Sequence, residues 1–173
     1  SPRAVPFPTI FRHTLRYSNR PHLREQGRAG DDLPVRLVDD LVVLARVVEF
    51  VEDVPHGADL PRPKVLALVR EALTTGRTEI RRRFEAPGPL KNNGPAVLVA
   101  TSFLMDQLIR VIFDFAEGKA YPAANPSAAE RLSVVATGGF GRGEMAPLSD
   151  IDLLFLRPYK QTPRGEQIVE FML

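Results

Sequence analysis

The stretch LSVVATGGFGRGEMAPLSDIDLLFL, residues 132–156, decides the fold, because the periodicity of the chain changes within it. Two short apolar segments, Leu132–Ala136 and Ile151–Leu156, flank a glycine-rich link, and Pro158 closes the second segment. Short apolar runs bounded by glycine and proline are typical of buried β-strands. Upstream of them, apolar residues recur at helical spacing. The sequence therefore predicts an α+β fold, in which a helical region leads into a strand, a turn and a second strand.

The link and the second segment contain the residues that could bind phosphate and metal ions. Gly138 and Gly139 end the first predicted strand, and without side chains they allow a phosphate to approach the backbone amides. Asp150 and Asp152 stand at the start of the second, and residues i and i+2 of a strand share one face. Both carboxylates would then reach one pair of metal ions, and Mg²⁺ prefers such oxygen ligands. The pattern predicts metal-dependent phosphoryl or nucleotidyl transfer.

Three further residues of the link have more than one interpretation. Arg142 is placed to offer a fork of donors to a triphosphate. Ser149 has two equal interpretations, a hydrogen bond to a phosphate oxygen or the hydrogen bond to a neighbouring amide that turn residues form. For Glu144, pairing with Arg142 or a solvated position is favoured over a role as a further acid. The competing interpretation of the whole segment is an ordinary glycine turn followed by two solvated acids.

Three helices are predicted before the first strand. The apolar spacing places them over Leu37–Val51, from Pro63 to Phe84 and over Leu98–Phe115. In the third helix the apolar residues, Met105 among them, alternate spacings of three and four, which predicts one buried stripe. Gly118 stands where a C-terminal cap belongs.

Local signals refine the helix ends. Arg81–Arg83 near the end of the second helix suit the negative pole of its dipole and a solvated face better than a binding patch. Ser127 and Glu130 have capping-box spacing, which predicts a short helix before the first strand. Thr162 and Pro163 suit the N-cap and first turn of a last helix.

Composition limits the classes of partner. The 173 residues are 44% hydrophobic, enough for a core, and 23 basic against 21 acidic residues leave a charge of +2, so no nucleic-acid partner is expected. There is no cysteine, and three scattered histidines, at positions 13, 22 and 56, lack the spacing of a zinc site. No apolar stretch is expected to reach the roughly 18 to 20 residues of a membrane span, and no signal sequence is evident. We therefore expect no membrane partner and a cytoplasmic location.

The link resembles a known signature. Gly138-Gly139, ten intervening residues and then Asp150-Ile151-Asp152 resemble the motif of the polymerase-β-type nucleotidyltransferase superfamily. The longer string from Gly138 to Leu156 is similar to that of the bacterial PII uridylyltransferase family. Three flanking pieces are also similar to that family, namely Met105–Arg110, Tyr121–Pro126 and Pro158–Pro163.

This resemblance implies a multifunctional enzyme of bacterial nitrogen regulation. Such an enzyme uses Mg²⁺ to transfer UMP from UTP to a tyrosine of the PII signalling protein, and a separate hydrolase domain removes the UMP. Glutamine acts as the effector through further domains. By position, Asp150 and Asp152 would be catalytic metal ligands, and Gly138 and Gly139 would bind the nucleotide phosphates.

Composition and periodicity predict a division of the chain, and the resemblance implies an incomplete site. We expect residues 1–36 to form a flexible proline- and arginine-rich arm, residues 37–126 a helical region, and residues 127–173 the start of a nucleotidyltransferase domain. The chain begins with Ser1 rather than methionine and ends inside an apolar segment, which suggests a fragment. The family pattern needs a third carboxylate on a later strand, so we expect the fragment alone to be inactive.

Three alternatives stay open. Within the superfamily, the motif also fits a glutamine synthetase adenylyltransferase or a small toxin–antitoxin nucleotidyltransferase, although more than 130 residues precede Gly138 here. The helices could instead form a module that binds a partner without catalysis. The third alternative is a structural helical module with no nucleotide contact.

Overall fold

The computed structural model describes residue 53 and residues 62–88, 91–123, 128–159 and 161–173. The predicted arm and the first predicted helix, Leu37–Val51, lie outside the described residues, as does Ser127 of the predicted capping box. A short 3-10 turn, Ala128–Glu130, follows that position.

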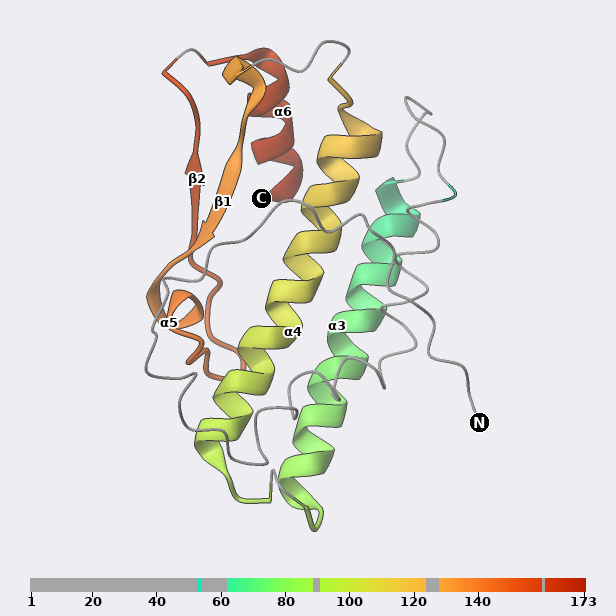
Figure 1. Ribbon diagram of the computed structural model, residues 1–173. Helices are drawn as coiled ribbons and strands as arrows, with labels where there is room; N and C mark the ends of the chain where they lie inside the picture. Colours follow the sequence, from blue (N-terminus) through green and yellow to red (C-terminus); the bar gives the residue numbers. More distant parts are fainter. Residues whose placement is uncertain (1–52, 54–61, 89–90, 124–127, 160) are drawn as a thin grey trace, which may run out of the picture.

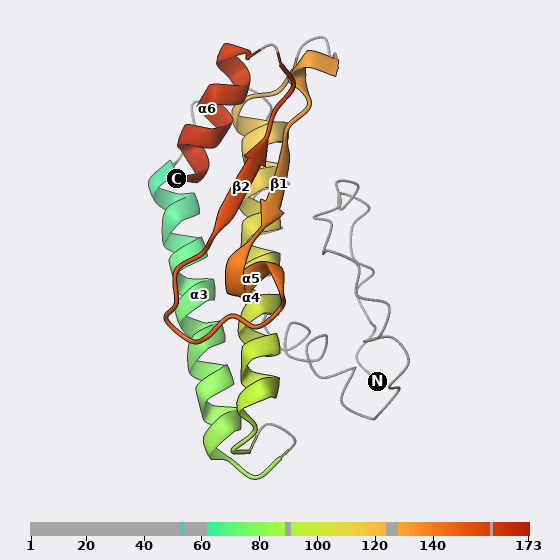
Figure 2. The same ribbon diagram turned by 90° about the vertical axis from the view of Figure 1, so that its left-hand side faces the viewer.

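One long helix occupies the middle of the molecule. Helix α4, Gly94–Phe115, lies beside helix α3, Arg62–Glu85, and a small sheet of β1, Ser133–Ala136, and β2, Leu153–Leu156, lies on the other side of α4 (Figures 1 and 2). Helix α6, Pro163–Met172, packs near the C-terminal end of α4. The mixture of helices with a small sheet is compatible with the predicted α+β class.

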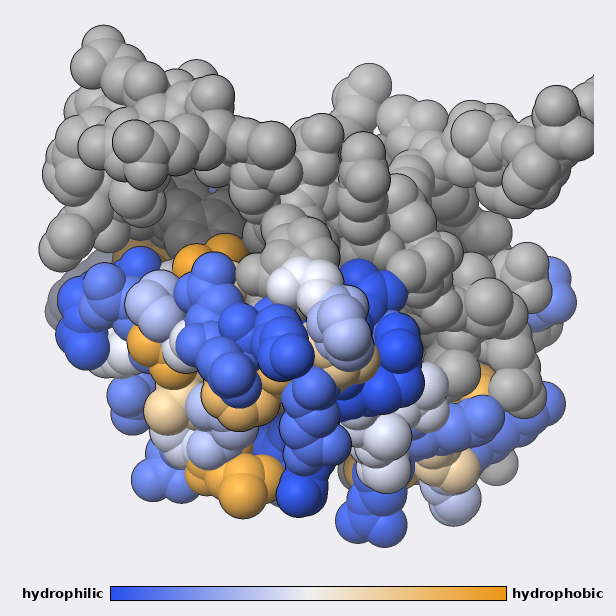
Figure 3. Space-filling model, turned by 90° about the horizontal axis from the view of Figure 1, so that it is seen from below, coloured by the Kyte–Doolittle hydropathy of each residue, from blue (hydrophilic) through white to orange (hydrophobic). Residues whose placement is uncertain are grey.

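Helix α3 confirms the second predicted helix. Its last turns carry intrahelical ion pairs, because Glu79 accepts from both Arg82 and Arg83 and Arg81 pairs with Glu85. The hydrogen bond from Arg82 is the main reason that the pKa of Glu79 falls to about 2. The arginine run is thus engaged in ion pairs along its own helix, which the sequence interpretation of a solvated face did not include. Figure 3 shows the molecule from below, where the lower ends of α3 and α4 in Figure 1 face the viewer. The described surface on this side is mostly hydrophilic.

Helix α4 is buried around most of its circumference, so the prediction of a single buried stripe is wrong. Met105 and Phe115 are in the core as expected, but Ser102, Asp106 and Ile109 are buried as well. A helix that is covered by neighbours on several sides needs no polar face. The spacing of three and four therefore located the helix correctly and underestimated how much of it is covered.

The contact between α3 and α4 depends on a glycine within α3. A Cβ on Gly76 would lie 2.6 Å from both Cδ atoms of Leu104, whose side chain is fully buried. Glycine inside a helix costs about 1 kcal/mol relative to alanine. Here it permits the two helix backbones to approach over Leu104.

Helix α4 does not end at a glycine cap. Its last turn widens into a π-helical turn, Ala116–Ala120, which contains Gly118 and closes with the Tyr121 amide donating to the Ala116 carbonyl at 2.9 Å. The predicted C-cap role of Gly118 is therefore wrong. A wide turn leaves carbonyls that need donors from elsewhere.

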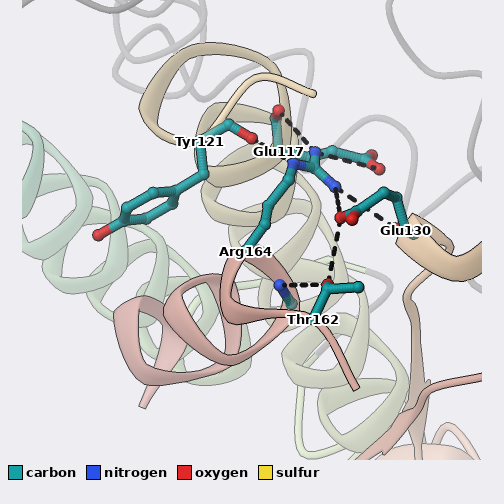
Figure 4. A network of polar contacts seen from close by, with 6 residues as sticks. Glu117, Tyr121, Glu130, Thr162 and Arg164 are labelled. Atoms are coloured by element: carbon teal, nitrogen blue, oxygen red, sulfur yellow. Dashed lines mark hydrogen bonds and ion pairs between the residues drawn. The ribbon is translucent and has the colours of Figure 1, made fainter. Parts of the chain in front are cut away.

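Arg164 of α6 supplies those donors (Figure 4). Its guanidinium donates to the carbonyl oxygens of Tyr121 at 2.5 Å and Glu117 at 3.1 Å, and more weakly to that of Glu130 at 3.4 Å. The side chain is only 15% exposed. One arginine therefore joins α6, the π-helical turn and the 3-10 turn before β1. The Thr162 hydroxyl caps α6 as predicted, accepting from the Gly165 amide at 3.2 Å.

The sheet has two antiparallel strands, with Ser133 opposite Leu156 and Ala136 opposite Leu153. Strand β2 begins at Leu153, later than predicted, so the aspartates precede the strand and their expected placement on it is wrong. The reason lies in β1, which ends at Ala136 because the chain then enters a helical turn. Only Thr137 extends the pairing, through its amide to the Asp152 carbonyl at 2.9 Å.

The composition of α4 corrects one further expectation. The helical stretch Gly94–Ala120 is long and apolar enough to cross a membrane by length and composition alone, contrary to the expected absence of such a stretch. Most of its apolar window is buried inside the structure. A helix that is hydrophobic around its circumference occurs in membranes and at the centre of packed cores alike.

We expect Arg164→Ala to lower the free energy of unfolding by about 2 to 4 kcal/mol, since it leaves three part-buried carbonyls without this donor. Urea denaturation provides the measurement. Arg81→Ala is the control, because Arg81 is 81% exposed and its pair with Glu85 is worth about 0 to 1 kcal/mol. Equal losses in the two variants would contradict a tethering role for Arg164.

Asp106 predicts a pH dependence of stability. Burial raises the pKa of Asp106 above its usual value of 3.8, against the effect of its 2.8 Å hydrogen bond from Arg110. The folded state then binds a proton at the Asp106 carboxyl more tightly than the unfolded state does. Protonated Asp106 therefore stabilises the fold fully below pH 3.8, and this stabilisation is lost as the pH rises through the raised pKa. Urea denaturation across this range should show wild type losing stability relative to Asp106→Asn. A constant difference between the two proteins would refute the assignment.

Candidate functional site

The glycine pair forms the first half of a helical turn. Helix α5, Gly138–Gly141, begins directly after β1 and lies beside α4 (Figures 1 and 2). Gly138 has φ +56°, a conformation that residues with a side chain rarely adopt. A Cβ on Gly138 would also overlap Oδ2 of Asp152. The structure thus brings the first glycine of the motif and the second aspartate into direct contact.

Two residues of this turn were not singled out from the sequence. A Cβ on Gly141 would overlap the carbonyl oxygen of Ala136, so this position also requires glycine for a close approach. Thr137 holds Asp152 twice, because its amide and its hydroxyl both donate to the Asp152 carbonyl, at 2.9 and 3.3 Å. The signal for Gly141 was present in the glycine run, whereas nothing in the sequence marks Thr137.

Asp150 and Asp152 are both exposed. They precede β2, so the alternation of a strand does not fix their side chains on one face. Asp152 is held at the edge of the sheet by Thr137. Asp150 lies in the segment before it, whose backbone has no ladder partner because β1 ends at Ala136. The two carboxylates are available to solvent and to ligands.

Arg142 and Glu144 pair with one another, as favoured from the sequence. The Arg142 Nε atom lies 3.2 Å from Oε2 of Glu144, and both side chains are about half exposed. The Arg142 Nη2 atom also lies 3.9 Å from the position that a Cβ on Gly139 would occupy. A guanidinium therefore stands over the second glycine of the motif.

Ser149 forms the turn that precedes Asp150. Its amide and its hydroxyl both donate to the Ala146 carbonyl, at 3.1 and 2.9 Å. Of the two interpretations left open by the sequence, a turn hydrogen bond is present, but its partner is the Ala146 carbonyl and not a neighbouring amide. Leu148, just before it, has φ +68° and is 79% exposed.

The described residues contain no group of three or more histidine, aspartate or glutamate side chains that would enclose a metal ion. A site built from Asp150 and Asp152 would offer two carboxylates and an open side. Open sites of this kind suit a cation that is completed by water and by the oxygens of a ligand. Gly138 lies against the Asp152 carboxylate and begins a helical turn, whose first amides have no partner within the turn.

Comparison with known proteins gives several relatives that share one name. The chain is 53% identical over 112 residues to the bifunctional uridylyltransferase/uridylyl-removing enzyme of Rhodospirillum rubrum, a match that covers 65% of this chain and 12% of that enzyme. It is 49% identical over 119 residues to the enzyme of that name from Azospirillum brasilense, covering 68% and 12%. The chain is a homologue of a segment of the bifunctional uridylyltransferase/uridylyl-removing enzymes. The resemblance noted in the sequence is thereby confirmed.

The homologous segment is short relative to these enzymes. With the enzyme of Erythrobacter litoralis the match extends over 139 residues at 43% identity, 80% of this chain and 14% of the relative. The chain thus spans about an eighth of the length of the curated relatives that it matches. No protein-family model matches the chain. No solved structure matches it either.

We expect Gly138→Ala to displace the carboxylate of Asp152, because the new Cβ would occupy the position of Oδ2. Gly143→Ala is the matched control: Gly143 has φ +73°, but a Cβ there meets nothing within 4 Å. Both variants should lose about 1 to 2 kcal/mol of stability from the left-handed backbone. The side-chain ¹³C shift of Asp152, measured by NMR, should change in Gly138→Ala alone. A change of equal size in both variants would contradict the contact.

Proposed function

We propose that this chain forms part of the nucleotidyl-transfer site of an enzyme that moves UMP from UTP to a tyrosine of the PII signalling protein. The observation that carries the proposal is the contact between Gly138 and the Asp152 carboxylate, found in a homologue of uridylyltransferases. The glycine pair and the acid pair lie far apart in the motif, and the fold brings one member of each together. Removal of UMP, glutamine sensing and a cytoplasmic location belong to the same proposal through the family resemblance.

The proposed roles follow from position and chemistry. The amides of Gly138 and Gly139 would donate to phosphate oxygens, which can approach because neither residue has a side chain. Arg142 would leave its half-exposed ion pair with Glu144 and bind the triphosphate. The triphosphate carries more negative charge than one carboxylate and therefore attracts the guanidinium more strongly. Ser149 holds the turn before Asp150, and in this proposal it acts on the nucleotide through that aspartate.

Asp150 and Asp152 would hold Mg²⁺. The residues fit this ion, because Mg²⁺ is usually bound by one or two protein carboxylates together with waters and substrate phosphates. Both carboxylates are exposed, and the absence of a side chain at Gly138 leaves room at Asp152. When bound, the ion supplies charge neutralisation for the triphosphate and polarisation of the phosphorus that is attacked.

Binding of UTP in the presence of Mg²⁺ tests the site on this chain. We expect UTP to shift the NMR signals of the Gly138, Gly139 and Arg142 amides only when Mg²⁺ is present. Asp150→Asn and Asp152→Asn should weaken this binding by about tenfold or more, since each removes a charged ligand. Glu170→Gln is the control, because Glu170 is an exposed carboxylate on α6.

Transfer itself is tested in a full-length enzyme that carries this segment, with radiolabelled UTP and PII. Label transfer that persists in Asp150→Ala and Asp152→Ala would show that the mechanism is wrong. Glycine amides that stay unmoved in the NMR titration would favour a module that does not contact nucleotides. Competition by ATP against UTP distinguishes a uridylyltransferase from an adenylyltransferase.

A further inference from the structure

The segment that joins α5 to β2, residues 142–152, carries Arg142, Ser149 and both aspartates, and we call it the α5–β2 loop. Most of it is exposed, including every residue from Ala146 to Asp152. Its geometry therefore depends on the few points at which it is attached. Any residue that fixes such a point determines where the proposed metal ligands lie.

The loop is attached to helix α4 at Met145. The Met145 side chain is 1% exposed, and its amide donates to the hydroxyl of Ser102 on α4 at 2.9 Å. Ser102 is itself 2% exposed, and its hydroxyl in turn donates to the Leu98 carbonyl of α4 at 2.9 Å. The hydroxyl therefore has a donor and an acceptor at once, which fixes its direction.

Beside Met145, the Glu144 amide donates to the Gly139 carbonyl at 2.9 Å, which holds the start of the loop to the glycine turn. The remaining attachment is at the other end of the loop, where Thr137 holds the Asp152 carbonyl. Asp150 lies between Met145 and Asp152, the attached residues on either side of it. So does Leu148, a leucine in the left-handed region, where strain of about 1 to 3 kcal/mol persists only when the surrounding structure imposes it. A loop that is strained in its middle needs both ends held.

We propose that Ser102 is a positioning residue for the nucleotide site: through the Met145 amide it sets the α5–β2 loop, and hence the position of Asp150, relative to the glycine turn. This inference rests on the proposed function for its ligand. Ser102 touches no nucleotide in this scheme. It belongs to α4, outside the glycine–aspartate motif, and it lies 43 positions before Met145 in the sequence.

Thr101 provides a matched control on the same helix. It is also 2% exposed, and its hydroxyl donates to the Val97 carbonyl at 2.8 Å, the same type of bond that Ser102 forms with Leu98. The two hydroxyls differ in the hydrogen bond from the Met145 amide, which Ser102 accepts. Ser102→Ala and Thr101→Val each remove one such hydroxyl from the core.

The experiment measures two quantities on the whole chain, hydrogen exchange of the Met145 amide and affinity for UTP with Mg²⁺. Ser102→Ala should accelerate Met145 exchange and weaken UTP affinity, each by about tenfold, the factor expected for one lost hydrogen bond. Thr101→Val should leave both unchanged after correction for global stability. In the unaltered chain, Met145 should exchange far more slowly than Ala146.

The outcomes separate this inference from the proposed function. If the unaltered chain binds UTP and Ser102→Ala binds it equally well, the positioning role is refuted and the proposed function stands. If the unaltered chain does not bind UTP, the proposed function fails, and faster Met145 exchange in Ser102→Ala still supports a tether. Should Ser102→Ala not fold, rapid Met145 exchange in the unaltered chain would overturn the tether by itself.

Discussion

The structure depends on the burial of α4 from several sides. An apolar helix of this length cannot remain exposed in water, so the neighbouring elements contribute residues to the core that forms around it. Helix α3 approaches closely because Gly76 has no side chain to keep Leu104 away. On the far side, Phe140 of α5 and Met145 of the loop are each 1% exposed and belong to the same core. The glycine turn therefore has a fixed position because its apolar residues are part of that core.

Burial of α4 also accounts for which predictions from sequence succeeded. Helices α3 and α6 carry strong local signals, a proline start in one and a threonine cap in the other, and both are where the sequence placed them. Local periodicity cannot report how many neighbours surround a helix, and the extent of burial of α4 was accordingly missed. The π-helical turn after Phe115 depends on Arg164, 47 positions from Glu117, and no local pattern contains that information.

The site shows the same division between local and distant causes. The pairing of Arg142 with Glu144 and the turn at Ser149 involve residues two or three positions apart, and a local pattern of this kind can be predicted from sequence. The placement of the aspartates on a strand was wrong because strand pairing is decided by the partner. Strand β1 ends where the glycines begin, which leaves Asp150 without a neighbour across the sheet.

This arrangement explains why glycine and aspartate occur together in the motif. Gly138 adopts a left-handed conformation to turn the chain away from β1, and that turn ends the sheet at Thr137. Because the sheet ends there, Asp152 sits at its last hydrogen bond, with its carboxylate against the bare α-carbon of Gly138. A side chain at position 138 would disturb the backbone turn and the carboxylate at once. One glycine therefore shapes both the turn proposed to meet phosphate and the acid proposed to meet metal, so a substitution there should affect the two functions together.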